Sequence, residues 1–128
     1  MVRPTKERRV EFIPKIKYFK PSGIPLREIE EIRLSIEEIE AVRLKDLKGL
    51  TQEEAAGKMN ISRPTYQRVL TEARKKIAEA LIKGKAIRFE GGDYKLAEYL
   101  DCEKCGSRFR RKFRHRGGSG NINCPDCE

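Results

Sequence analysis

The sequence lacks long hydrophobic runs and has a single histidine among its 128 residues. No segment approaches the ~18 apolar residues of a transmembrane helix, and the first residues, MVRPTKERR, lack the apolar stretch of a signal peptide. We therefore expect a cytoplasmic protein with no membrane partner. The chain also has no phosphate-binding loop, no glycine-rich dinucleotide turn and no Ser/His/Asp set beyond His115, so we expect no enzyme activity.

What the chain does have is positive charge, with 29 Lys and Arg against 20 Asp and Glu and a formal net charge of +9. This balance favours a polyanionic partner. The charge is also segregated, because residues 28–62 hold nine acidic and five basic residues whereas residues 63–88 hold eight basic and two acidic ones. A helix that is merely solvated does not need such segregation, which favours nucleic acid.

Two helices joined by a tight turn are predicted around residues 51–70. Thr51 with Glu54 forms a capping box that begins the first helix. Asn60 ends this helix because it tolerates a left-handed conformation, and Ser62 is a good N-cap for the next. The second helix is expected to run to about residue 83, where Gly84 suits a C-cap. Its buried stripe is predicted to contain Tyr66, Val69, Ala73, Ile77 and either Ala80 or Leu81.

An earlier helix begins at a second capping box, formed by Ser35 and Glu38. It is expected to end at Gly49, with Leu50 closing back on Leu44. Its apolar residues are predicted to point one way, and they are Ile36, Ile39, Val42 and Leu47. This helix would complete a trihelical unit of the kind in which helix-turn-helix motifs usually lie.

Short strands are predicted on both sides of the helices. Residues 10–13 alternate as a strand does, and the following Pro14 would close it. Residues 86–90 form a second candidate, followed by a Gly91-Gly92 turn toward Tyr94 and Leu96. Pairing of residues 86–90 with residues 10–13 would tie the N-terminal arm to the body.

The predicted fold class is therefore mainly α, with a trihelical helix-turn-helix domain, short flanking strands and a small zinc-ribbon-like C-terminal domain. Residues 1–27 form a basic extended arm, residues 28–96 the helix-turn-helix domain and residues 97–128 the zinc-ribbon-like domain. The arm's aromatic residues either pack on the helical core or anchor the arm along a DNA groove.

The candidate DNA-binding residues lie at the start of the second helix of the motif, where exposed side chains can reach base edges or phosphates. They are Ser62, Arg63, Thr65, Gln67 and Arg68. The competing interpretation is a helical bundle that touches no nucleic acid, since capped helices with an Asn turn also occur there.

Four cysteines carry the strongest chemical signal. Cys102 and Cys105 form one C-x-x-C pair, Cys124 and Cys127 form another, and the spacing between the pairs predicts one tetrahedral thiolate site for zinc, with iron as the alternative. Disulfides are disfavoured in a cytoplasmic protein, and a redox dithiol would need one pair only. The segment between the pairs is basic, so its arginines either neutralise the site or reach phosphate, while His115 is expected to be a surface residue.

Two segments resemble a known family. YFKPSGIPLREIEEI and IEEIEAVRLKDLKGLTQEEAAGKMNISRPTYQRVLTEARKKIAEALIKGKAIRFEGGDY, with RRV near the start, are similar to an uncharacterised family of small prokaryotic proteins described as DNA-binding, whose helix-turn-helix resembles region four of bacterial sigma factors. The resemblance covers residues 8–94. It implies binding in the major groove, with Arg63, Thr65, Gln67 and Arg68 toward bases or phosphates and Tyr66 buried. Pro64 departs from the sigma-factor pattern.

We therefore expect a sequence-specific DNA-binding protein that regulates transcription. Its partners would be double-stranded DNA and, through the ribbon, the transcription machinery; its oligomeric state is open. Two alternatives use the same features. A rubredoxin-like electron carrier would place iron at the cysteines, with the helices as a docking module, and an RNA-binding protein would use the same positive charge.

Overall fold

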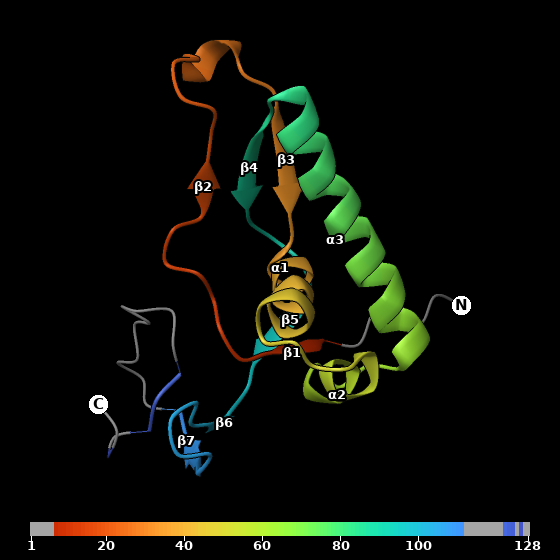
Figure 1. The fold of residues 1–128 in the computed structure, drawn as a ribbon, viewed down its shortest axis with the longest axis vertical. Helices are drawn as coiled ribbons and strands as arrows, with labels where there is room; N and C mark the ends of the chain where they lie inside the picture. The colour runs from red at the N-terminus through yellow and green to blue at the C-terminus, as the bar shows by residue number, and fades with distance from the viewer. Residues whose placement is uncertain (1–6, 112–121, 125, 127–128) are drawn as a thin grey trace.

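The computed structural model describes residues 7–111, 122–124 and 126. Within these ranges the chain forms three α-helices and seven short strands, shown in Figure 1. The helices are α1 (Ile36–Val42), α2 (Gln52–Lys58) and α3 (Arg63–Lys83), with a 3₁₀ turn at Leu26–Glu28 and a π-helical turn at Arg43–Leu47. The strands are β1 (Arg8–Val10), β2 (Tyr18–Phe19), β3 (Glu31–Leu34), β4 (Ala86–Phe89), β5 (Tyr94–Leu96), β6 (Tyr99–Asp101) and β7 (Arg108–Arg110). The expected combination of three helices with short strands is confirmed, and no helix in the described ranges is long and apolar enough to cross a membrane.

The helix ends follow the predicted caps. Both capping boxes form, at Ser35 with Glu38 and at Thr51 with Glu54. Ser62 caps α3, its hydroxyl accepting a hydrogen bond from the amide of Thr65 at 3.3 Å. Local hydrogen bonding at these positions therefore fixes where the helices begin.

The main core lies where α1, α2 and α3 meet. Tyr66 is fully buried there, and its hydroxyl donates to the Ala41 carbonyl at 2.7 Å. Ala55 and Ala56 of α2 face the same core, and their small side chains allow α3 to approach closely. On α3 the buried stripe continues through Ala80, whereas Leu81 is 75% exposed.

The prediction is wrong for one core residue, Leu47. Leu47 is 78% exposed, and Leu44 is fully buried in its place. The cause is the π-helical turn Arg43–Leu47, in which the Lys48 amide donates to the Arg43 carbonyl. The wider turn shifts the side-chain positions after Val42, so the 3.6-residue spacing used in the prediction no longer applies. Gly49 does end the segment, with the Leu50 amide donating to the Leu44 carbonyl at 3.1 Å as expected.

The strand pairing also differs from the prediction. β4 is the central strand of a β2-β4-β3 sheet, antiparallel to β2 and parallel to β3. β1 pairs in parallel with β5, so residues 86–90 do not pair with residues 10–13, and the strand near the start ends at Val10. Gly91-Gly92 is therefore no hairpin turn. The Gly91 carbonyl instead accepts from the Ile36 amide, and a Cβ on Gly92 would lie 2.5 Å from a Glu37 oxygen, so these glycines close against the start of α1.

Two further apolar clusters join the strands to the rest of the chain. One lies between the sheets and the helices and contains Val10, Leu34, Ile36, Ala73 and Phe89. The other is small and lies around the β6–β7 hairpin, where Ala97, Leu100 and Ile122 pack with Phe12 and Phe109. Figure 1 shows this hairpin at the lower left, apart from α3.

Candidate nucleic-acid face and metal centre

The turn between α2 and α3 has the conformation expected from its sequence. Asn60 has a φ of 56°, in the left-handed region, which ends α2. Met59 before it is fully buried, and Ile61 after it is partly buried against the helical core. The turn therefore holds the first residues of α3 in a fixed direction relative to α2.

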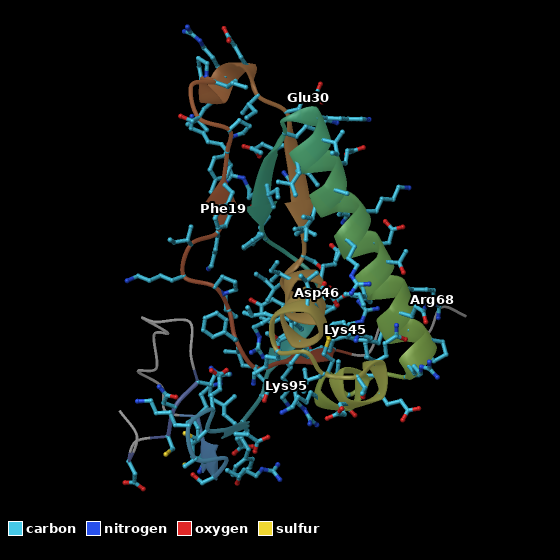
Figure 2. The ribbon with its side chains drawn as sticks, viewed as in Figure 1. Phe19, Glu30, Lys45, Asp46, Arg68 and Lys95 are labelled. Atoms are coloured by element: carbon cyan, nitrogen blue, oxygen red, sulfur yellow. The ribbon has the colours of Figure 1, made fainter. Side chains whose placement is uncertain are left out.

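The five predicted DNA-binding residues divide into two groups. Ser62 and Thr65 bind each other, since the Ser62 hydroxyl donates to the Thr65 hydroxyl at 2.9 Å in addition to capping the helix. Arg63, Gln67 and Arg68 are exposed, and none of them has a hydrogen bond or ion pair with another described residue. Figure 2 shows Arg68 on the outer side of α3. Of the five predicted DNA-binding residues, only these three therefore have side chains that are fully available to a partner.

Most of the basic charge that follows Arg68 is neutralised within the protein. Five of the eight basic residues in segment 63–88 form ion pairs: Arg74 with Asp46 at 2.5 Å, Lys76 with Glu38 at 2.8 Å, Lys83 with Glu79 at 3.7 Å, Lys85 with Glu30 at 3.2 Å and Arg88 with Glu31 at 2.9 Å. Four of the five acids belong to the acidic segment 28–62. The charge segregation seen in the sequence therefore serves largely to pair two parts of one fold.

Three cysteines form a candidate metal centre. The sulfur atoms of Cys102, Cys105 and Cys124 lie within 4.8 Å of one another, and none of the three is in a disulfide. Zinc–sulfur bonds of about 2.3 Å in a tetrahedron place sulfurs about 3.8 Å apart, so these residues fit one metal ion. Cys127, the predicted fourth ligand, lies outside the described residues, as does His115.

The local backbone favours the thiolate form of Cys102 and Cys105. Cys102 and Cys105 lie on the turn between β6 and β7, which tightens at Gly106, where φ is 75°. Burial by itself raises the pKa of the Cys102 thiol. Hydrogen bonds from backbone amides, including those of Cys124 and Cys105, outweigh this effect and lower the pKa to about 6. Hydrogen bonds from Ser107 lower the pKa of Cys105. The thiolate is the metal-binding form, so the turn favours the state that a metal needs.

The described arginines near the cysteines are held by the protein. The Arg108 guanidinium lies 5.0 Å from the centroid of the Tyr99 ring, and Arg110 pairs with Glu98 at 3.1 Å. Arg111 donates to the carbonyl of Ala97 at 2.9 Å and to the carbonyl of Glu11. The remainder of the predicted basic loop, from residue 112 to residue 121, lies outside the described residues.

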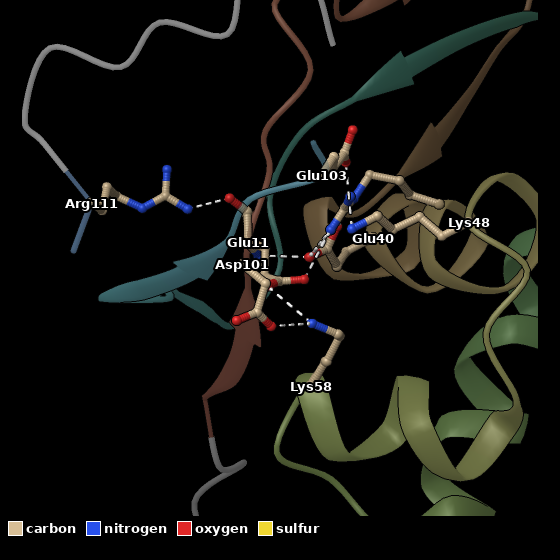
Figure 3. Close-up of polar contacts among 8 residues, drawn as sticks. Glu11, Glu40, Lys48, Lys58, Asp101, Glu103 and Arg111 are labelled. Carbon is tan, nitrogen blue, oxygen red and sulfur yellow. Dashed lines mark hydrogen bonds and ion pairs between the residues drawn. The ribbon is translucent and has the colours of Figure 1, made fainter. Parts of the chain in front are cut away.

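A buried charge network, which the sequence did not indicate, joins the β6–β7 hairpin to the helices (Figure 3). At its centre Glu40, 1% exposed, accepts two hydrogen bonds from Arg43, at 2.5 and 3.1 Å, and one from the Glu11 amide at 2.6 Å. Burial lowers the pKa of Arg43, but the hydrogen bonds and charge of Glu40 outweigh it, and the pKa is raised. Lys58 of α2 then links Glu11, at 3.5 Å, to Asp101 of β6, at 3.2 Å.

Known proteins resemble the whole chain. The family described as a protein of unknown function, DUF134, matches residues 1–97. A UPF0251 protein of Halothermothrix orenii is 64% identical over 129 residues, which cover 100% of this chain and 96% of the relative. The UPF0251 proteins of Pelotomaculum thermopropionicum and Moorella thermoacetica are 51% and 49% identical over 128 residues, covering 99% of this chain and 93% and 83% of the relatives. No solved structure gives a significant match. The expected membership of an uncharacterised prokaryotic family is confirmed, and the chain belongs to the DUF134 (UPF0251) family of proteins of unknown function.

Proposed function

We propose that the protein is a transcriptional regulator that binds specific sequences of double-stranded DNA through the first turns of α3. The observation that carries the proposal is the exposure of Arg63, Gln67 and Arg68 without described partners, on a helix whose other basic residues are mostly paired. Unpaired arginines at the start of a fixed helix are available for base edges and phosphates.

The arrangement of α2 and α3 supports a helix-turn-helix. The two helices pack together through Ala55, Ala56 and Tyr66, and the turn at Asn60 is short. In such motifs the N-terminal residues of the second helix enter the major groove while the first helix crosses the backbone. The buried stripe of α3 leaves the face carrying Arg63 and Gln67, one turn apart, toward solvent.

Selection of bound fragments from sheared genomic DNA tests this function. A sequence-specific regulator enriches a common sequence motif, and a duplex carrying that motif should bind at least ~10³-fold more tightly than a duplex of mixed sequence. Uniform recovery of all fragments would contradict sequence-specific binding. Structured RNA that displaces the enriched duplex at lower concentration than mixed-sequence DNA does would favour the RNA-binding alternative.

We also propose that the metal is zinc, that Cys127 completes the ligand set, and that the ion has a structural role. Zinc would fix the β6–β7 hairpin and so hold Asp101 and Arg111 against the helical body. Elemental analysis of protein from unsupplemented cells should find one zinc per chain. Iron in its place, with a red colour in the oxidised state, would contradict zinc and favour the rubredoxin-like alternative.

A further inference from the structure

A polar hollow lies beside the turn that begins α3. It has a volume of about 280 Å³ and is lined by residues of β1, β5, the α2–α3 turn and the β6–β7 hairpin. Three of its lining residues are basic and exposed: Arg9, Lys95 and Arg108. We call these three residues the strand-side basic cluster.

The charges of this cluster are not neutralised by the fold. Arg9 and Lys95 are direct partners in the parallel β1–β5 pair, so two like charges lie on neighbouring strands, which is unfavourable without a counter-charge. No carboxylate among the described residues lies within ion-pair distance of either side chain. Arg8, on the opposite face of β1, contrasts with them, since it pairs with Glu37 at 2.5 Å.

The other charges around the hollow do not remove this excess. Glu98 is engaged with Arg110, and the Arg108 guanidinium is positioned over the Tyr99 ring. Glu7, which is exposed, is the remaining acid among the lining residues. The hollow therefore presents more positive than negative charge to solvent and is suited to an anion.

The position of the hollow relates it to α3. The Arg9 amide donates to the Met59 carbonyl at 2.9 Å, and Asn60 lines the hollow. Asn60 precedes Arg63 by three residues, which span at most about 11 Å. The major groove is about 12 Å wide, so the phosphate backbone at its edge lies within about this width of a helix turn inside the groove. The span from Arg63 to Asn60 is of the same size. Figure 2 shows Lys95 and Arg68 on opposite sides of α2.

We infer that the strand-side basic cluster is a second DNA-contact surface, which binds phosphates of the backbone beside the groove that α3 enters. The inference rests on the proposed DNA-binding function. Phosphate contacts carry no sequence information, so this surface sets affinity and orientation while Arg63, Gln67 and Arg68 set the sequence preference.

The test measures the affinity of the full chain at several salt concentrations for two duplexes, one enriched by selection and one of mixed sequence. The double variant Arg9→Gln, Lys95→Gln should reduce the log-log salt slope by ~0.9 for each phosphate that the protein no longer neutralises. At 0.15 M salt, relative to 1 M, this corresponds to about fivefold weaker binding for one phosphate and roughly 30-fold weaker binding for two. Both duplexes should lose affinity by the same factor.

A double variant of matched charge provides the control. Lys15→Gln, Lys17→Gln removes two exposed charges between β1 and β2 and should leave the slope nearly unchanged. An equal loss of affinity in this control, or an unchanged slope in the Arg9 and Lys95 variant, would overturn the inference. A changed sequence preference in the Arg9 and Lys95 variant would also overturn the inference, because such a change would indicate that these side chains contact bases. Wild-type protein that binds neither duplex would overturn the proposed function itself.

Discussion

Arg63 and Arg68, at the beginning of α3, differ from Arg74 and Lys76, further along the same helix, in what surrounds their charges. The first two are exposed and have no partner among the described residues. The second two form ion pairs, with Asp46 of the π-helical turn and with Glu38 of α1. One helix therefore carries both structural and available positive charge.

This difference changes what the sequence charge can be used to argue. A count along the chain treats the basic segment 63–88 as one surface that needs an external polyanion. The fold supplies most of the counter-charge itself, from the acidic segment that packs beside it. Only the charge that remains after this pairing supports a nucleic-acid partner. On α3 it is Arg63 and Arg68 in the first two turns, and Lys75 beyond the middle of the helix.

The largest expected effect concerns the buried ion pair between Glu40 and Arg43. Glu40→Ala leaves the Arg43 guanidinium buried without its main partner and the Glu11 amide without an acceptor. We expect the free energy of unfolding to fall by ~3–5 kcal/mol, measured by urea denaturation. The matched control is Glu72→Ala on the exposed face of α3, which should stay within about 0.5 kcal/mol of wild type. Equal stability of the two variants would show that the buried network is not structural.

The next largest effect concerns the unpaired charges of Arg63 and Arg68. Arg63→Ala and Arg68→Ala should each cost ~1–3 kcal/mol in binding the enriched duplex if the side chain makes a bidentate base contact, and should relax the preference at one base position. Thermal stability should stay unchanged, because neither side chain forms a hydrogen bond or ion pair with a described residue. Lys75→Ala is the control, since it removes an exposed charge about 10 Å beyond Arg68 along the helix. Intact binding and preference in both arginine variants would move recognition to another face.

The features predicted correctly from the sequence depend on short stretches of chain. Capping boxes, the left-handed Asn60 and the Gly84 C-cap each involve residues within a few positions, so the helix ends are visible in the sequence. The cluster of Cys102, Cys105 and Cys124 belongs to the same class in part, because Cys102 and Cys105 lie on one turn. Such signals survive folding because the hydrogen bonds that define them form within one turn.

The features that the sequence could not provide depend on contacts between distant segments. The partners of β1 and β4 are chosen by how the sheets pack, and short strands carry too few side chains to specify a register. The Glu11–Glu40 contact joins residues 29 positions apart. The exposure of Leu47 has a different, local cause, because it follows from a π-helical turn that the apolar spacing does not indicate.

The smallest expected effect concerns the exposed pair of Arg74 and Asp46. Their contact is bidentate, at 2.5 and 3.1 Å, but both side chains are more than 40% exposed, so solvent screens the attraction. Arg74→Ala and Asp46→Asn should each reduce the free energy of unfolding by ~0.2–1 kcal/mol in urea denaturation. Neither should alter the sequence preference, because Arg74 lies about 16 Å from Arg63 along the helix axis, beyond the turns that a major groove accepts. If Arg74→Ala instead relaxed the preference as strongly as Arg68→Ala while the fold remained intact, paired and unpaired basic residues of α3 would not differ in role.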